Sequence, residues 1–378
     1  MRKSSNPFLL KGYISAELFC DRKREIEVLF ANVQNGIDTT LISARRMGKT
    51  GLIFRFFDQL TEQGEKKPIY VDIFSSRNLS DFVKLLAEAI LLGFPDKTTI
   101  GARFLEFIKG FRPLIGYDPL TGQPQIQINY QSAQEKEYTL QGLLNFLEGQ
   151  EVPIVLAIDE FQQISQYPEK NIEALLRTYT QNLKYIRFIF CGSRKAMMIN
   201  LFSNVKRPFY ATTQYLMLEE IERKTYAQFI RDKFSGAGMT ITEEALEMVL
   251  DWSLLHTFYT QSLCNMLYYI ADNQIELATV KLACVELLKR NEPVFYQYRQ
   301  LLTAAQWNFL IAVAKEGGVK QLTAQKFIAK YEIGTPANAR RISRSLVEKE
   351  LLLEIATKKE TTYRVYDLFL ARWLESEY

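Results

Sequence analysis

The chain has very few of the residues from which protein metal clusters are built. Among its 378 residues there is one histidine, His256, and there are four cysteines, which lie far apart. The cysteines are Cys20, Cys191, Cys264 and Cys284. None of their spacings is typical of a Cys/His zinc site, which excludes that class of metalloprotein. We expect the thiols to be reduced, as they are in cytosolic proteins.

Long hydrophobic runs and an excess of one charge are also lacking. The longest apolar stretch, 85–94, is interrupted by Glu88 and is shorter than the ~18 residues that a membrane-spanning helix needs. Residues 8–10 are too short a run for the core of a signal peptide. With 47 basic and 43 acidic residues, the net charge is +4, so contact with nucleic acid must be local. We expect a cytoplasmic protein of two or three domains that does not bind membranes.

The segment 43–50 reads Ser-Ala-Arg-Arg-Met-Gly-Lys-Thr and lies between an apolar strand-like run and an amphipathic helix. This is the pattern of a P-loop, whose backbone N–H groups surround a phosphate at a helix N-terminus. Ser43 stands where the usual pattern has glycine. The predicted nucleotide-binding residues are Ser43, Ala44, Arg45, Arg46, Met47, Gly48, Lys49, Thr50 and Gly51. The alternative is a basic loop before an ordinary helix.

Within this loop, Lys49 is expected to contact the β- and γ-phosphates of ATP, and Thr50 to bind Mg²⁺. About 110 residues later, the apolar strand 154–158 ends in Asp159 and Glu160. Carboxylates at the end of a buried strand are costly unless they have a function. We predict that Asp159 serves the metal and that Glu160, with Lys49, is catalytic by polarising the attacking water. The alternative is that the pair caps the next helix.

Strand-like and helix-like segments alternate up to about residue 218. The expected strands cover 39–44, 68–74, 154–158, 186–190 and 215–218. The expected helices cover 23–35 (or start at 16), 50–63, a segment from 80 onward, and 172–180. This alternation predicts an α/β fold with a parallel, doubly wound sheet. Ser193 follows the fourth strand, where it could sense the γ-phosphate or cap the next helix.

Residues 96–138 break the alternation because they are rich in glycine and proline. We interpret them as an insertion or elaborated loop. The alternating segment 125–130 could form a small hairpin strand, and the next helix is expected to start near Leu140.

The rest of the chain predicts two further domains. Apolar residues at helical spacing over 219–290 predict a helical lid. In 291–378 we expect helices at 303–315, at 323–331 and from Thr335-Pro336, then a hairpin over 351–366 with Lys358 and Lys359 at its tip. Three helices and a wing predict a winged helix-turn-helix. The predicted domains are therefore a P-loop core at 1–218, the lid, and the winged helix.

The third helix of the winged domain carries Arg340, Arg341 and Arg344, which with the tip lysines could contact DNA. The alternative is a solvated, charged face used for packing or protein contacts. The glutamates at 348, 350, 354 and 360 dilute the positive charge.

Taken together, Phe19–Glu25, the P-loop, Ile158–Phe161 and the winged helix resemble the archaeal-type ATPases of the AAA+/STAND P-loop group, relatives of origin-recognition initiators. The resemblance implies a nucleotide held between the core and the lid, with Phe19–Glu25 near the adenine. Such relatives tend to have an aromatic residue, a small residue and an arginine before the fifth strand. This chain has Tyr210-Ala211-Thr212, with Arg207 as the nearest arginine. Its lid segment 256–259 also lacks the Gly-Gly-x-Pro character of relatives.

Two functions follow from these patterns. The first is an ATPase that binds Mg·ATP and couples binding or slow hydrolysis to a conformational change. The alternative is a nucleotide-dependent switch or DNA-binding regulator with little hydrolysis. The absence of a clear arginine finger favours the switch, and Glu160 favours hydrolysis. The expected partners are ATP, DNA at the winged helix, and a second copy or another protein.

Overall fold

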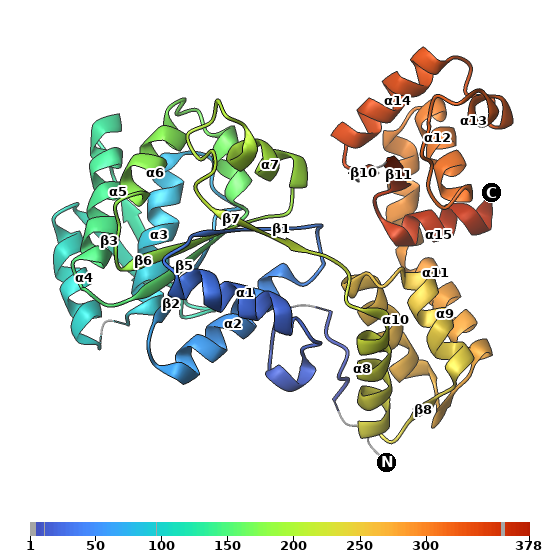
Figure 1. Cartoon of the computed structure of the whole chain (residues 1–378), viewed down its shortest axis with the longest axis horizontal. Coiled ribbons are helices and arrows are strands. Elements are labelled where there is room, and N and C mark those ends of the chain that lie inside the picture. Colours follow the sequence, from blue (N-terminus) through green and yellow to red (C-terminus); the bar gives the residue numbers. More distant parts are fainter. Residues whose placement is uncertain (1–4, 11, 96, 357–359) are drawn as a thin grey trace. The chain divides into compact units, whose positions relative to one another are not determined.

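The structure is a computed structural model that describes residues 5–10, 12–95, 97–356 and 360–378. The described residues form two compact units. One contains 12–221, and the other combines 5–10 with 222–378 (Figure 1). None of the described helices has both the length and the apolar character needed to cross a membrane.

A five-stranded, all-parallel sheet is the centre of the first unit, and its strand order is β2-β5-β6-β1-β7. Its strands are β1 (Thr39–Ser43), β2 (Lys67–Asp72), β5 (Ile154–Asp159), β6 (Ile186–Gly192) and β7 (Gln214–Leu218). Residues of β1 and β5 are buried throughout, as expected when helices cover both faces. The predicted parallel α/β fold is confirmed.

Helices cover the two faces of the sheet unequally. Alternate strand residues point to opposite faces, so Leu41 packs with α1 and α2 while its neighbour Ile42 packs with the helices on the other side. Figure 1 shows these helices on the two sides of the sheet. The first face holds α1 (Lys23–Gln34) and α2 (Lys49–Gln63). The second holds α3 (Leu79–Gly93), α4 (Thr99–Lys109), α5 (Ala133–Glu148), α6 (Ile172–Thr180) and α7 (Lys195–Ser203). The first unit also contains two short 3₁₀ helices, η1 (Ala16–Leu18) and η2 (Phe161–Gln166).

The insertion 96–138 has more regular structure than its composition indicated. It contains α4 and a complete antiparallel hairpin of β3 (Pro113–Tyr117) and β4 (Pro124–Ile128). The prediction that the next helix starts near Leu140 is wrong, because Ser132 accepts a hydrogen bond from the N–H of Glu135 and starts α5 at Ala133.

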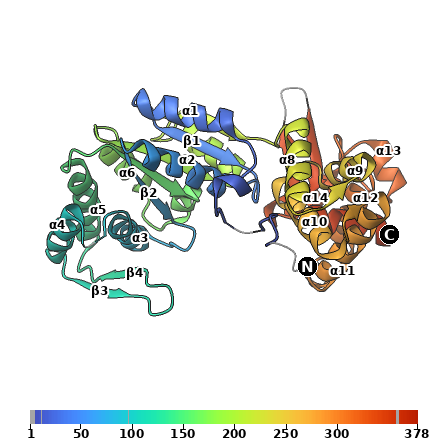
Figure 2. The same cartoon turned by 90° about the horizontal axis from the view of Figure 1, so that it is seen from below.

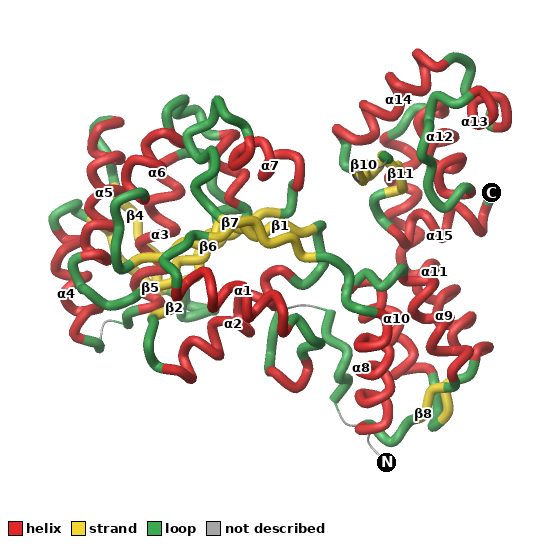
Figure 3. The backbone as a smooth tube through the Cα atoms, viewed as in Figure 1, coloured by secondary structure: helices red, strands yellow, loops and turns green. Residues whose placement is uncertain are grey.

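The second unit is mainly helical (Figure 3). Its first part comprises α8 (Arg223–Gly236), β8 (Thr240–Ile241), α9 (Glu243–Ser253), α10 (Thr257–Ile270), β9 (Gln274–Ile275) and α11 (Leu277–Leu301). Helix α11 continues through Pro293, so no break in the backbone separates the predicted lid from the winged segment.

The winged segment has the predicted three helices and hairpin. Its elements are α12 (Ala304–Lys315), α13 (Gln325–Lys330), α14 (Pro336–Glu348), β10 (Leu352–Ala356), β11 (Thr361–Val365) and α15 (Leu368–Glu377). Thr335 caps α14 and Pro336 is its first residue, as the sequence predicts. The final helix, α15, was not predicted, and it packs on α12 through Trp307 and Trp373. The predicted wing-tip lysines, Lys358 and Lys359, lie outside the described residues.

The N-terminal segment 5–10 is part of the core of the second unit. Phe8 is 1% exposed, and its ring centroid lies 4.7 Å from that of Phe234. Asn6 donates to the carbonyl of Asn265 (3.1 Å), and Asn265 donates to the carbonyl of Phe8 (2.8 Å). These two side chain–backbone hydrogen bonds hold the segment 5–10 against α10.

We expect Phe8→Ala to lower the free energy of unfolding of the second unit by about 3 kcal/mol, because it leaves a cavity among buried side chains. Leu10→Ala is the control, since Leu10 is 45% exposed. Chemical denaturation followed by tryptophan fluorescence measures both variants, because all three tryptophans lie in this unit. Equal midpoints for wild type and Phe8→Ala would show that the segment does not contribute to the core.

Candidate nucleotide-binding site

The loop between β1 and α2 has the backbone geometry of an anion-binding turn. Arg46 (φ 63°) and Gly48 (φ 91°) both adopt left-handed conformations, and α2 starts at Lys49. Such a turn directs successive backbone N–H groups toward one point, where the positive end of the helix dipole adds to their effect. Ser43, in place of the usual glycine, is buried, and its hydroxyl donates to the carbonyl of Ala44 (3.0 Å).

The side chains of Lys49 and Thr50 meet the carboxylate of Asp159 at the carboxyl end of the sheet. The Lys49 ammonium contacts Asp159 Oδ1, and both side chains are buried. Thr50 Oγ1 donates to Asp159 Oδ2 at 3.1 Å. The structure thus brings together the P-loop residues and the strand-end carboxylate that lie 110 residues apart in sequence.

Glu160 lies beside this group in a strained conformation. Its φ of 55° is left-handed, and its side chain makes no capping bond to η2. Instead, Glu160 Oε2 accepts hydrogen bonds from Ser193 Oγ (2.8 Å) and from the amide of Gln162, and Oε1 lies 3.7 Å from Lys49 Nζ. Helix capping therefore does not explain the side-chain position of Glu160. Ser193 does not cap α7 either.

Two residues of this cluster were not predicted from the sequence. Tyr70 OH donates to Asp159 Oδ2 at 2.9 Å, and Gln162 is 3% exposed. Tyr70 lies on β2, and the register of β2 with β5 could have indicated that it is near Asp159. Gln162 lies in η2, for which the sequence has no comparable signal.

Burial controls the protonation of the groups around the carboxylates. It raises the pKa of Tyr70 far above its ordinary value, so the phenol stays a hydrogen-bond donor. Burial also raises the pKa of Cys191 to about 12, so this thiol is neutral and is not a nucleophile at neutral pH.

The donor set fits a hydrated magnesium ion that arrives with a nucleotide. Thr50 and Asp159 offer one hydroxyl and one carboxylate, which are the hard oxygen ligands that Mg²⁺ prefers. The described residues contain no group of three or more His, Cys, Asp or Glu side chains that could hold a metal ion. Since Mg²⁺ is commonly bound by one or two protein ligands plus phosphate oxygens, the site needs the phosphates to complete it.

The segment that the resemblance places near the adenine lies against the P-loop helix. A Cβ added at Gly51 would come within 3.3 Å of the Phe19 ring, so the ring packs directly on α2. Arg22 is buried and donates to Glu25 at 2.9 Å, while its Nη2 has no hydrogen-bond partner among the described residues.

Arg207, the nearest candidate for an arginine finger, forms an ion pair with Glu173 on α6. Burial raises the pKa of Glu173, and Arg207 opposes this rise. The guanidinium is therefore already engaged within its own unit.

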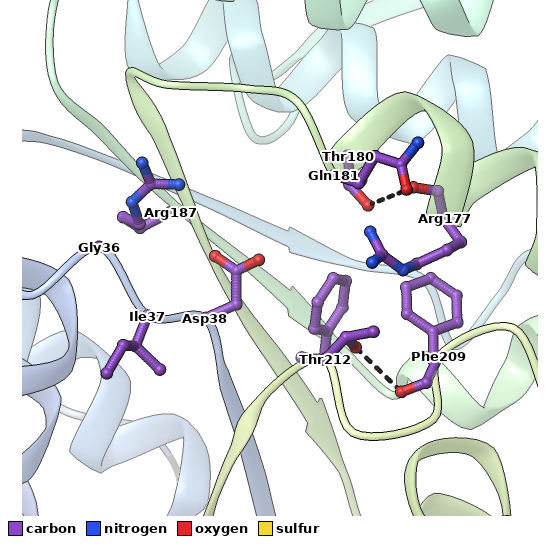
Figure 4. A pocket seen from close by; sticks show the side chains of 10 residues that line it. Gly36, Ile37, Asp38, Arg177, Thr180, Gln181, Arg187, Phe209 and Thr212 are labelled. Carbon is purple, nitrogen blue, oxygen red and sulfur yellow. Dashed lines mark hydrogen bonds between the residues drawn. The ribbon is translucent and has the colours of Figure 1, made fainter. Parts of the chain in front are cut away.

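A separate pocket of about 290 Å³ lies at the amino ends of β1 and β6, away from the P-loop (Figure 4). Asp38, Arg177 and Arg187 line it, and Asp38 accepts a hydrogen bond from the N–H of Phe188 at 2.8 Å. Burial raises the pKa of Asp38. None of the predicted site residues lines this pocket.

Comparison with known families identifies the core of this chain. Residues 19–255 match the family described as an ATPase domain predominantly from Archaea, which covers more than half of the sequence. The chain belongs to this family. It is thus a nucleotide-binding P-loop ATPase, in agreement with the geometry of the loop. Residues 293–376 also match a probable winged helix domain.

Solved structures show the same fold over nearly the whole chain. A Walker-type ATPase of Pyrococcus abyssi is 18% identical to the present chain, with a TM-score of 0.66. The match covers 97% of the present chain and 99% of the Pyrococcus chain. The ORC2 protein of Aeropyrum pernix, in ADPNP-ADP complexes, is 16% identical, with a TM-score of 0.60 and coverage of 99% and 96%. The ORC1 protein of Aeropyrum pernix, in complex with DNA, is 14% identical, with a TM-score of 0.53 and coverage of 99% and 97%. No curated protein sequence matches this chain.

Proposed function

We propose that this ATPase binds Mg·ATP at the P-loop, hydrolyses it slowly, and couples these events to a conformational change. The observation that carries the proposal is the meeting of Lys49 and Thr50 on Asp159. These residues supply a cation for the β- and γ-phosphates and two oxygen ligands for Mg²⁺. The similarly folded ORC2 protein is described in ADPNP-ADP complexes, which supports an adenine nucleotide as the ligand.

In this proposal Glu160 polarises the attacking water, and its neighbours position it. Ser193 and the amide of Gln162 both donate to Oε2, which leaves Oε1 as the oxygen directed toward Lys49 and the phosphates. Bound Mg²⁺ would neutralise charge that develops on the phosphate oxygens. Ser193 would then position Glu160 and sense the γ-phosphate.

The coupling would start at Lys49. Its ammonium contacts both Asp159 and Glu160, and a triphosphate would compete for the same cation. Because Ser193 donates to Glu160 and immediately precedes Arg194, the N-cap of α7, a shift of the Glu160 carboxylate would reach that helix.

Adenine recognition is proposed for Phe19 and Arg22. The Phe19 ring packs beside the P-loop helix, and Arg22 Nη2 is a buried donor that a ring nitrogen of adenine could satisfy.

The competing proposal is a switch that binds ATP and cleaves little of it. Pairing of Arg207 with Glu173 supports it, since that arginine is not free to contact a neighbouring nucleotide. Titration with a fluorescent ATP analogue, together with phosphate release from ATP in the same buffer, distinguishes the two. Slow release that needs Mg²⁺ supports the ATPase, binding without release supports the switch, and absence of binding contradicts both.

We also propose that the winged helix contacts DNA. On α14, Arg340, Arg341 and Arg344 are exposed, while Ile342 and Leu346 are buried on the opposite side of the helix. A helix with an arginine face is the electrostatic footprint of phosphate contact. The ORC1 protein, which has the same fold, is described in complex with DNA. Self-association or another protein partner stays a prediction.

We expect the double variant Arg340→Ala/Arg344→Ala to weaken binding to duplex DNA, because two phosphate contacts are lost, and to reduce the salt slope by about two units. Fluorescence anisotropy at several salt concentrations, with ATP present, measures both quantities. Lys281→Ala/Arg290→Ala removes the same charge from exposed positions of α11 and should leave the slope unchanged. If wild type shows no salt-dependent binding, the domain is a protein-contact module.

A further inference from the structure

The hairpin of the insertion presents one unpaired edge. Strand β4 packs on α3, where Glu88 Oε1 accepts a hydrogen bond from the N–H of Ile126 at 2.8 Å. Strand β3 lies on the outer side of the hairpin (Figure 2). No other strand of the described chain pairs with β3.

The hydrogen-bond pattern of the hairpin shows which groups β3 directs outward. In an antiparallel pair of strands, directly opposed residues alternate between two kinds of pair. In one kind, the two residues hydrogen-bond to each other through both N–H and C=O groups; in the other, these groups point away from the partner strand. Ile115 lies opposite Ile126, whose N–H bonds to Glu88 and not to β3. Asp118 N–H donates to Gln123 at 2.8 Å, which fixes the same alternation independently. The outer edge of β3 therefore offers the N–H and C=O of Ile115 and Tyr117.

This edge is complementary to itself when the centre is Ile115. With two copies antiparallel, each Ile115 donates to and accepts from the other, and each Tyr117 N–H meets the C=O of Pro113. Pro113 has no N–H, but it is needed only as an acceptor in this register. Centring on Gly116 would also oppose outward-directed groups, those of Ile115 and Tyr117, but it would place Arg112 opposite Leu120 of the other copy instead of Asp118.

Charge complementarity selects the same register. In the pairing centred on Ile115, Arg112 and Asp118, which flank β3 on its two sides, come close to each other at both ends of the strand pair. Opposite charges at the facing ends of the two strands favour this pairing. Strand β3 itself carries no charged residue of the kind that protects exposed edges from pairing.

Apolar side chains accompany this edge. Leu114 is 63% exposed, Ile115 38% and Tyr117 53%. Ile115 shares a face with its cross-strand neighbour Ile126, which is buried. Pairing would place the two Ile115 side chains side by side and cover each Tyr117 with a Pro113 of the other copy.

We propose that β3 is a self-association edge, through which two copies of this chain form a four-stranded sheet in the order β4-β3-β3-β4. The contact joins two five-residue strands, which is smaller than the interface of a stable dimer. The dimer is therefore weak and depends on protein concentration.

Sedimentation velocity of the full chain over a hundredfold concentration range tests the proposal. We expect wild type to shift from monomer to dimer, and Ile115→Lys to stay monomeric because two ammonium groups would meet at the centre. Leu114→Lys is the matched control. Leu114 is more exposed but lies on the other face, opposite Gly116, so this variant should still dimerise. If wild type stays monomeric, the proposal is overturned, and the edge would then be a binding site for another protein. Equal effects of the two variants would also overturn it.

A cysteine pair tests the register. Ile115→Cys would place two Cα atoms about 5.5 Å apart, within disulfide reach, whereas Leu114→Cys would place them about 8 Å apart, beyond it. The four native cysteines are buried and should not compete. Mild oxidation should link the Ile115→Cys chains, as non-reducing electrophoresis would show. Linkage of Leu114→Cys alone, or of neither variant, contradicts the register.

Discussion

Lys49→Ala is expected to weaken ATP binding by about 100-fold, or about 2.7 kcal/mol. The ammonium group contacts both Asp159 and Glu160, and it lies where the β- and γ-phosphates are expected. Without it, the phosphates would lose a charge-assisted partner and face two carboxylates whose charge is no longer balanced. Equilibrium titration with a fluorescent ATP analogue measures the loss.

The control for this result is Lys109→Ala. Lys109 is an exposed lysine on α4 that pairs only with Glu106 in the described structure, so its loss should not change ATP affinity. Thermal unfolding of both variants establishes that they are folded. Wild-type affinity in folded Lys49→Ala would show that the P-loop lysine does not bind the phosphates.

Glu160→Gln is expected to keep ATP binding and to lower the hydrolysis rate by at least about 100-fold. An amide cannot polarise water as a carboxylate does, but it keeps the size of the side chain and can still accept from Ser193. Asp159 and Thr50, the proposed metal ligands, are unchanged. Phosphate release under saturating Mg·ATP, compared with binding by the same variant, separates the two effects.

Glu151→Gln is the matched control, because Glu151 is exposed and precedes the amino end of β5. It makes the same chemical change at the opposite end of the strand and should hydrolyse ATP at the wild-type rate. If Glu160→Gln also hydrolyses at that rate, another residue polarises the water.

The sequence predicted correctly those parts of the fold in which the local pattern of apolar residues matches the burial of the element in the folded protein. Strand β5 is buried on both faces, so its continuous apolar run was sufficient. Helix α4 was missed because the glycines and prolines of 96–138, among them Gly101, indicated an insertion or loop. In the structure, glycine is required there, because a Cβ would come within 2.0 Å of the carbonyl of Pro95. Helix α11 continues past Pro293 and so runs across the predicted boundary between residues 290 and 291.

The site was only partly predictable for a related reason. The P-loop and the strand-end carboxylates have local sequence signals, and their spacing placed them at one edge of a parallel sheet. Tyr70 and Gln162 have no such signal, since their roles depend on the register of β2 with β5 and on the turn at Glu160. The self-complementarity of β3 was also hidden, because it depends on which N–H groups β4 leaves unbonded.

A crystal structure of the full chain with Mg²⁺ and a non-hydrolysable ATP analogue tests the central claim most directly. We predict that the β-phosphate lies within hydrogen-bond distance of the backbone N–H groups of Gly48, Lys49 and Thr50. Mg²⁺ should lie between Thr50 and Asp159, with Lys49 Nζ moved from Asp159 toward the phosphates. Phosphates bound elsewhere, for example at Arg177 and Arg187 in the pocket at the amino ends of the strands, would contradict the account.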